Sequence, residues 1–272
     1  ALIKIHNPTP EEFYNTDHFA PLKRLVAEEL IANQLALRRI KKTTQSNPAQ
    51  AMTRNTLIEE FVGRLPFTLT HSQERVVNEI KEDLRKPVPM MRLLQGDVGS
   101  GKTVVAALAM SIAADNETQS VLMAPTELLA EQHMDNLEGW FEPLGVKTVL
   151  LKSKLTQKER RLILSEIKSG EASIIVGTHA LFQNKVEYKN LSLVIVDEQH
   201  RFGVDQRLSL VKKTGDNNSV PHQLIMTATP IPRTLAMTAY GDLDTSVLDE
   251  LPKGRGQIKT IVIPDDKRSD VV

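Results

Sequence analysis

The stretch that decides the fold of this chain reads Gly96-Asp97-Val98-Gly99-Ser100-Gly101-Lys102-Thr103. It fits the pattern G-x-x-x-x-G-K-[ST], in which glycines allow backbone N–H groups to approach phosphate oxygens closely. Lys102 adds a mobile positive charge for the β- and γ-phosphates, and the hydroxyl of Thr103 is placed to ligate Mg²⁺. A predicted strand precedes this P-loop and a predicted helix follows it, which is the context that the motif requires. The whole loop is therefore predicted to bind a nucleotide.

A second motif lies further along the chain, where an apolar run over residues 193–196 leads directly into Asp197 and Glu198. An Asp-Glu pair after a strand is usually a solvated loop. Beside a P-loop in the same sheet, we expect Asp197 to hold magnesium through water. We expect Glu198 to orient or deprotonate the attacking water.

A third pair of residues precedes the first strand of the predicted nucleotide domain. An aromatic ring at Phe67 and the amide of Gln73 suit an adenine base, because an amide pairs with both a donor and an acceptor on one base edge. The alternative is an N-capped helix beside a buried Phe, since Thr70 and Gln73 have capping-box spacing.

Further polar residues follow other predicted strands. The hydroxyls of Thr227 and Thr229 would couple the phosphate state to lobe movement, although a motif of this kind taken alone is more often a plain turn. Helix N-termini and hydroxyls at Thr126, Thr178 and His179 would hold nucleic-acid phosphates without reading sequence. Ordinary N-caps are the alternative for these positions.

The order of elements predicts an α/β fold. Short apolar runs, each bounded by turn residues, indicate buried parallel strands at 91–94, 121–124, 148–151, 173–176, 193–196 and 223–226. Helical patterns at 103–114, 127–140 and 157–168 lie between several of them, so we expect a parallel sheet covered on both faces. Ligands of such sheets bind beyond the carboxyl ends of the strands, where both nucleotide motifs lie. Ahead of this region, residues 21–42 predict one long amphipathic helix and residues 57–62 a short one.

Composition excludes several classes of protein. Among 272 residues, Lys and Arg number 34 and Asp and Glu also number 34, so bulk charge indicates no polyanionic partner, although a local basic groove can exist in a neutral total. The chain has no Cys, and its seven His show no metal-binding spacing, so disulfides and a zinc site are not expected. No apolar run approaches the ~20 residues of a membrane span, no signal peptide opens the chain, and a reducing cytosol is the default.

The motifs, in this order, resemble those of superfamily-two helicases and, more closely, RecG-type ATP-dependent DNA helicases. The segments that carry the resemblance are residues 90–103, 123–133, 197–204 and 227–234, with Met-Ala-Pro-Thr-Glu-Leu-Leu-Ala-Glu-Gln-His at 123–133 and Thr-Ala-Thr-Pro-Ile-Pro-Arg-Thr at 227–234. The resemblance covers residues 65–272 strongly. It implies a RecA-like P-loop NTPase lobe that uses ATP and Mg²⁺ to move on double-stranded DNA. It also implies remodelling of branched DNA, such as stalled forks and Holliday junctions, in repair and recombination.

The resemblance also implies roles and boundaries. Lys102 and Glu198 match catalytic positions, Thr103 and Asp197 the magnesium positions, and Gln199 and His200 join Thr227 and Thr229 as coupling residues. Residues 1–64 match the end of a DNA-binding wedge region, 65–257 the first motor lobe, and 258–272 the start of a second lobe. We expect a piece of a longer bacterial, cytoplasmic and nucleoid-associated protein, monomeric and without a membrane.

Two features leave alternatives open. The second lobe, its arginine finger and the translocation hairpin of the family have no counterpart in the chain, so we expect weak ATP binding and slow hydrolysis. A transcription-repair coupling translocase shares the segments at 200–204 and 227–234, although Ser100, Gln199 and residues 205–207 favour the first interpretation. The third alternative is a nucleotide-dependent DNA-binding module without turnover.

Overall fold

The structure, a computed structural model, describes residues 5–7, 9–10, 20–183, 186–197, 219–228 and 243–252, without the side chains of 37, 40, 44 and 182. The predicted site residues Glu198, Gln199, His200 and Thr229 lie outside this described part, as does the predicted lobe start at 258–272.

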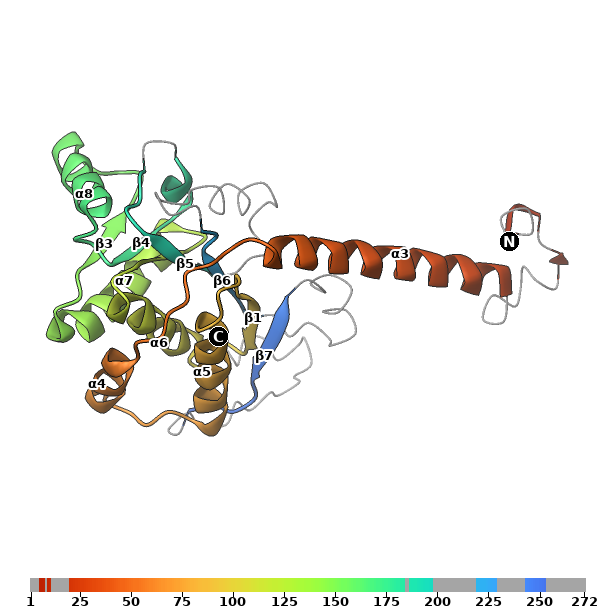
Figure 1. The fold of residues 1–272 in the computed structure, drawn as a ribbon, viewed down its shortest axis with the longest axis horizontal. Helices are drawn as coiled ribbons and strands as arrows, with labels where there is room; N and C mark the ends of the chain where they lie inside the picture. Colours follow the sequence, from red (N-terminus) through yellow and green to blue (C-terminus); the bar gives the residue numbers. More distant parts are fainter. Residues whose placement is uncertain are drawn as a thin grey trace, which may run out of the picture.

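A parallel seven-stranded sheet forms the centre of the molecule (Figure 1). Its strands, in spatial order, are β3 (Thr148–Leu151), β4 (Ile174–Gly177), β2 (Gln119–Met123), β5 (Leu191–Asp197), β6 (His222–Thr227), β1 (Met91–Gly96) and β7 (Asp244–Leu248). Every adjacent pair of these strands is parallel. The predicted α/β fold with a parallel sheet is confirmed.

Successive residues of the central strands face opposite sides of the sheet, as the pleat requires. In β5, Leu193 and Ile195 join the larger core with the helices α4 (Thr56–Arg64), α5 (His71–Leu84), α6 (Lys102–Asp115) and α7 (Glu127–Phe141). Val194 and Val196 join a second core with α8 (Gln157–Ser169) and the short 3₁₀ helix η3 (His179–Phe182). Helices therefore cover both faces, and each face has its own apolar core.

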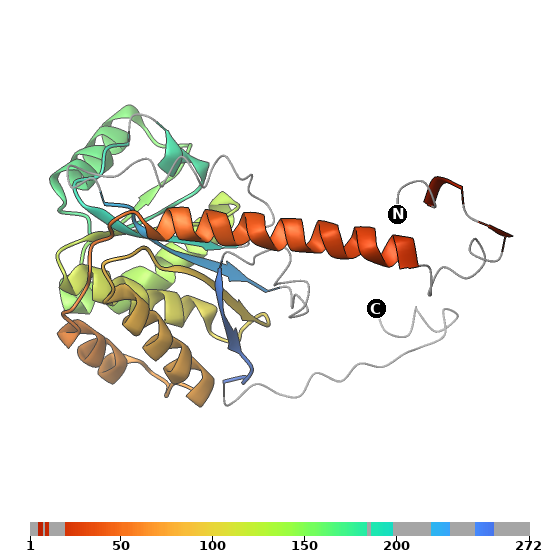
Figure 2. The same cartoon turned by 45° about the vertical axis from the view of Figure 1, so that its right-hand side comes forward.

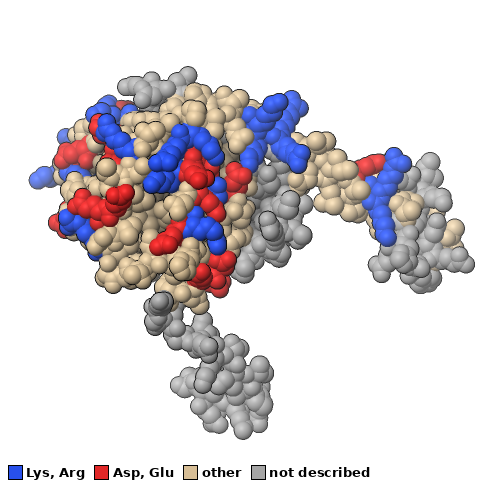
Figure 3. All heavy atoms as spheres, turned by 60° about the horizontal axis from the view of Figure 1, so that its bottom comes forward, with Lys and Arg blue, Asp and Glu red and all other residues tan. Residues whose placement is uncertain are grey.

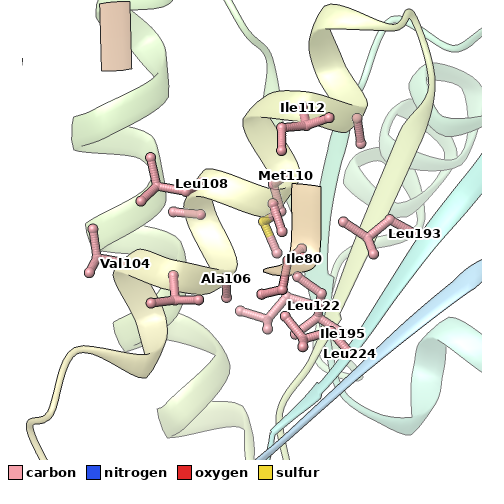
Figure 4. Packing of buried hydrophobic residues seen from close by; sticks show 14 of the residues in the cluster. Ile80, Val104, Ala106, Leu108, Met110, Ile112, Leu122, Leu193, Ile195 and Leu224 are labelled. Carbon is pink, nitrogen blue, oxygen red and sulfur yellow. The ribbon is translucent and has the colours of Figure 1, made fainter. Parts of the chain in front are cut away.

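The helix α6 is almost wholly enclosed. Every residue from Val104 to Ala113 is buried, and Figure 4 shows its side chains packed between Ile80 of α5 and strand residues that include Leu122, Ile195 and Leu224. Small Ala residues at 106, 107, 109 and 113 allow this close approach on all sides. The helix that begins at the P-loop is therefore fixed rigidly in the core.

Local capping signals set where several helices begin. Thr70 and Gln73 form a reciprocal capping box at the start of α5, and Thr156 and Glu159 form another at the start of α8. The side chain of Thr126 accepts a hydrogen bond from the Leu129 N–H at the start of α7. These contacts satisfy N–H groups that a helix leaves unpaired at its first turn.

The long helix α3 (Ala20–Gln45) projects away from the sheet and its helices in both cartoon views (Figures 1 and 2). Near its C-terminal end, Lys41 forms an ion pair of 2.8 Å with Asp244 of β7. Along its length it exposes the apolar side chains of Leu22, Val26, Leu30, Ile31 and Leu35. None of the described helices is both long enough and apolar enough to cross a membrane.

Residues 46–55, which we call the strap, connect α3 to α4 and lie on the sheet domain. Met52 of the strap is fully buried, and its N–H donates to the carbonyl oxygen of Leu84 at 2.8 Å. After the strap, Phe61 of α4 packs against the rings of Trp140 and Phe141 at centroid distances of 6.0 and 5.0 Å. Met52, Ile58 and Phe61 thus belong to the core of the nucleotide domain, while the division at residue 64 stays a prediction.

Candidate functional site

The carboxyl ends of the parallel strands meet at one edge of the sheet, and the predicted site residues gather there. The P-loop follows β1, Asp197 ends β5 and Thr227 ends β6. In the strand register, Asp197 is level with Met226, which is level with Leu94. The nucleotide motifs therefore occupy neighbouring strands, whereas Thr126 and Thr178 follow β2 and β4 in the other half of the sheet.

Two glycines allow the tight turns of the P-loop backbone. Gly99 and Gly101 have φ values of 78° and 90°, in the left-handed region that other residues avoid. At Gly101, an added Cβ would clash with the side-chain amide nitrogen of Gln73. Because α6 begins at Lys102, its positive N-terminal end faces the loop, an arrangement that favours bound phosphate.

Lys102 lies folded onto its own loop. Its ammonium donates to the carbonyl oxygen of Gly96 at 2.6 Å and to that of Asp97 at 3.0 Å. Thr103, the next residue, is half-buried in the first turn of α6. The ammonium of Lys102 thus lies against the backbone of the P-loop, and its contact with phosphate stays a prediction.

Asp197 is held by a histidine from another element. Its Oδ2 lies 2.9 Å from Nε2 of His133 on α7, and each residue is only 8% exposed. The alternation along β5 places Asp197 on the same side of the sheet as Leu193 and Ile195, which is the side that α6 and α7 cover. Its carboxylate therefore lies on the face where the P-loop helix begins.

The oxygen ligands expected for magnesium are compatible with this arrangement. A Thr hydroxyl and a carboxylate are hard oxygen donors, which Mg²⁺ prefers, and it retains several waters when so bound. Thr103 and Asp197 would supply that donor set, and Lys102 would supply a positive charge for phosphate. Among the described residues, no group of three or more His, Cys, Asp or Glu side chains forms a metal cluster.

Gln73 contacts the P-loop directly. Its Nε2 donates to the carbonyl oxygen of Ser100 at 2.8 Å, and its Oε1 accepts from the Thr70 N–H at 2.9 Å. Gln73 is buried, whereas Phe67 is 45% exposed. Both atoms of the amide are engaged within the protein, so the adenine role of these two residues stays a prediction.

The other half of the edge carries the residues predicted to contact nucleic acid. Thr126 is exposed at the N-cap of α7 and His179 is exposed in η3, but Thr178 is buried. The hydroxyl oxygen of Thr178 is buried and has no hydrogen-bond partner within the described structure. The structure thus brings Thr126 and His179 to the surface and keeps Thr178 beneath it.

The loop after β3 is pinned to α7 beside Thr126. The Ser153 N–H donates to the carboxylate of Glu127 at 3.0 Å, and this hydrogen bond is the main cause that lowers the pKa of Glu127. Lys152 forms an ion pair of 2.8 Å with Glu131. On the face drawn in Figure 3, positive and negative side chains are interspersed.

Two further residues near this edge of the sheet are Thr227 and His133. Thr227 is buried at the end of β6, and the alternation places it on the face opposite to Met226 and Asp197. The sequence does not predict a site role for His133, because the histidines show no metal-binding spacing. A signal was present: His133 is a polar residue at a core position of the α7 pattern, between Ala130 and Leu137.

Comparisons with known proteins decide the family. The model of the DEAD/DEAH box helicase family matches residues 70–238, which is more than half of the chain. The chain belongs to this helicase family. The matched span runs from the capping box of α5 to beyond β6, so it includes the P-loop, Asp197 and Thr227 of the helicase site.

Individual helicases give a finer comparison. The chain is 52% identical over its full length to "ATP-dependent DNA helicase RecG" of Pasteurella multocida, and 51% identical to the protein of that name from Escherichia coli K12. It spans 40% of the length of each of these relatives. The solved structure of RecG bound to a three-way DNA junction matches with a TM-score of 0.83 and 39% identity, over 95% of this chain and 34% of that one.

Proposed function

We propose that this chain is the first motor lobe of an ATP-dependent DNA helicase of the RecG type, acting on branched DNA in repair and recombination. The observation that carries the proposal is the pairing of the P-loop after β1 with Asp197 at the end of β5, at one edge of one parallel sheet. Lys102 would supply positive charge to the β- and γ-phosphates of ATP, and Thr103 and Asp197 would hold its Mg²⁺. Glu198 is the catalytic carboxylate that orients water.

The role of branched DNA rests on the relatives. Two helicases that are 52% and 51% identical to this chain over its full length are named RecG, and a RecG structure contains a three-way junction. Thr126 and His179 are exposed after the neighbouring strands β2 and β4, at the same edge of the sheet. They supply contacts to phosphate. Phosphate contacts position a protein on DNA without reading its sequence, which suits recognition by shape.

The segments of the relatives that this chain does not span would supply the further parts that the motor needs. A second helicase lobe closes over ATP and provides the arginine finger, so this chain alone binds ATP weakly and hydrolyses it slowly. Gln199, His200, Thr227 and Thr229 then transmit closure to the DNA side. The whole protein acts as a monomer on the bacterial nucleoid in the cytoplasm.

Binding of a fluorescent ADP in the presence of Mg²⁺ tests the nucleotide site. We expect saturable binding by the chain and at least a tenfold loss in Lys102→Ala, because the loop then lacks its mobile cation. Lys158→Ala, which removes an exposed lysine of α8, serves as the matched control and should bind as the unaltered chain does. Equal affinity of Lys102→Ala and the unaltered chain would refute the nucleotide assignment.

Steady-state ATP hydrolysis tests the motor, with a three-way junction and a linear duplex of equal length as effectors. Turnover near background in all samples supports a half-site that awaits its second lobe. Turnover that the junction stimulates and Lys102→Ala abolishes would mean that the site is completed within this chain or by a second copy. Nucleotide binding with junction binding, but without turnover in the full-length protein, would instead favour the binding-module alternative.

A further inference from the structure

The buried side of α7 carries one polar residue. Ala130, Leu137 and Phe141 are fully buried at helical spacing and belong to the larger core, and His133 occupies the same stripe. A buried imidazole among apolar residues is unfavourable unless its ring nitrogens are hydrogen-bonded. The buried imidazole of His133 therefore needs a hydrogen-bond partner that offsets the cost of its desolvation.

The partner is the carboxylate at the end of β5. Nε2 of His133 lies 2.9 Å from Oδ2 of Asp197. An ionised carboxylate only accepts hydrogen bonds, so Nε2 of the ring carries the hydrogen and donates it. With both side chains about nine-tenths buried, little water competes for this bond. The bond fixes one oxygen of the carboxylate. Because the carboxylate is rigid and planar, the direction of its other oxygen is fixed as well.

We propose that His133 is a positioning residue that orients the Asp197 carboxylate for the magnesium ion of the bound nucleotide, an inference that rests on the magnesium role assigned to Asp197 in the proposed function. Hydrogen bonds to a ligating carboxylate hold it in the geometry that the metal needs, and their loss typically weakens metal affinity 10–100-fold. A purely structural role would be expressed in stability alone, without a change in the response to magnesium.

The same histidine joins the two halves of the sheet edge. Thr126, the predicted phosphate contact, caps α7, and His133 lies about 10 Å further along this helix. Asp197 lies on the strand next to β2, which leads into α7. The hydrogen bond between His133 and Asp197 therefore connects α7, which Thr126 caps, with the end of β5.

The test measures how magnesium strengthens the binding of fluorescent ADP to the complete chain. We expect His133→Leu to raise the half-saturating Mg²⁺ concentration about tenfold or more, with affinity for ADP in EDTA unchanged. His133→Gln keeps an N–H donor on a side chain of similar reach and should recover most of the response. Asn136→Leu, on the exposed side of α7, is the matched control and should respond as the unaltered chain does.

Two results would overturn the inference. One is a half-saturating Mg²⁺ concentration in His133→Leu equal to that of the unaltered chain. If His133→Leu does not fold, as judged by circular dichroism, His133→Gln and His133→Asn replace it. Asn is too short to reach Asp197, so a higher magnesium requirement in Asn than in Gln supports the inference, and identical requirements in both refute it.

Asp197→Asn separates this inference from the proposed function. A changed magnesium response in Asp197→Asn with no change in His133→Leu refutes only the role of His133. An unchanged magnesium response in Asp197→Asn refutes the metal assignment of Asp197 and the inference with it.

Discussion

The amide of Gln73 and the carbonyl of Ser100 are joined by a hydrogen bond of 2.8 Å, which ties the start of α5 to the P-loop across 27 residues of sequence. The same side chain completes the capping box of α5 through the Thr70 N–H. Gln73 therefore links the segment before the first strand to the P-loop.

Gln73→Ala should reduce the free energy of unfolding by about 1–3 kcal/mol, because a buried carbonyl loses its donor and the cap loses a partner. Denaturant unfolding measures this loss. Glu159→Ala removes the equivalent residue of the α8 capping box, which makes no contact with the P-loop in the described structure, and should cost less. Equal losses in the two variants would show that the bond to Ser100 contributes nothing.

Gly101→Ala should destabilise the chain and abolish nucleotide binding, since residue 101 has a φ of 90° and a methyl group there meets the Gln73 amide. Gly145 also has a positive φ, 68°, but nothing lies within 4 Å of its added Cβ. Gly145→Ala therefore measures backbone strain alone, about 1–2 kcal/mol. Denaturant unfolding of both variants should show a larger loss for Gly101→Ala, and a loss no larger than that of Gly145→Ala would contradict the clash.

Protonation of the buried His222 should lower the free energy of unfolding at acid pH. Burial lowers the pKa of His222 below its usual value, against smaller raising effects from the Gln50 carbonyl and Asp83. Its Nδ1 accepts from the Met90 N–H at 3.0 Å, which a protonated ring cannot do. The unfolded chain takes up this proton near pH 6.5 and the folded chain only at lower pH, so stability is complete above about pH 6.5 and falls below it.

Unfolding free energies at pH 7.5 and 5.5 measure this effect, with His222→Gln expected to reduce the difference between the two. His71 is exposed at the start of α5, so His71→Gln is the control and should leave the difference unchanged. A pH dependence that persists in full in His222→Gln would assign it to other groups.

Asn116→Ala should loosen the strap. The Asn116 side chain accepts from the N–H groups of Thr53 and Arg54 at 3.0 and 3.1 Å and donates to the Arg54 carbonyl oxygen at 3.0 Å. Without these bonds, we expect faster amide hydrogen exchange in residues 49–57 with the sheet still protected. Asn136→Ala removes one exposed bond within α7 and should change exchange only there.

The elements that sequence predicted correctly are those whose signals are local. Continuous apolar runs identified the central strands, because strands buried on both faces need apolar residues at every position. Capping boxes at Thr70 and Thr156 depend on residues three apart and were also confirmed. The strand β7 was missed, because an edge strand exposed on one side has the polar residues Asp244, Thr245 and Ser246.

The missed parts of the site depend on tertiary contacts. The polar sequence of the strap predicts a linker, yet Met52 is buried. Its backbone N–H is satisfied by a group distant in sequence, the Leu84 carbonyl oxygen. His133 and Asp197 are 64 residues apart in sequence, and no spacing rule connects a helix residue with a strand end at that separation. The roles of Glu198, Gln199, His200 and Thr229 stay predictions, since these residues lie outside the described structure.

The two carbonyl oxygens that hold Lys102 have a consequence for the turnover of nucleotide. An arriving phosphate competes with Gly96 and Asp97 for one ammonium, so binding is an exchange of partners and yields only the difference between them. The same exchange runs in reverse when product departs, because the cation returns to oxygen atoms already within reach. Binding of a phosphate at this loop would therefore replace two existing hydrogen bonds of Lys102, and its departure would restore them.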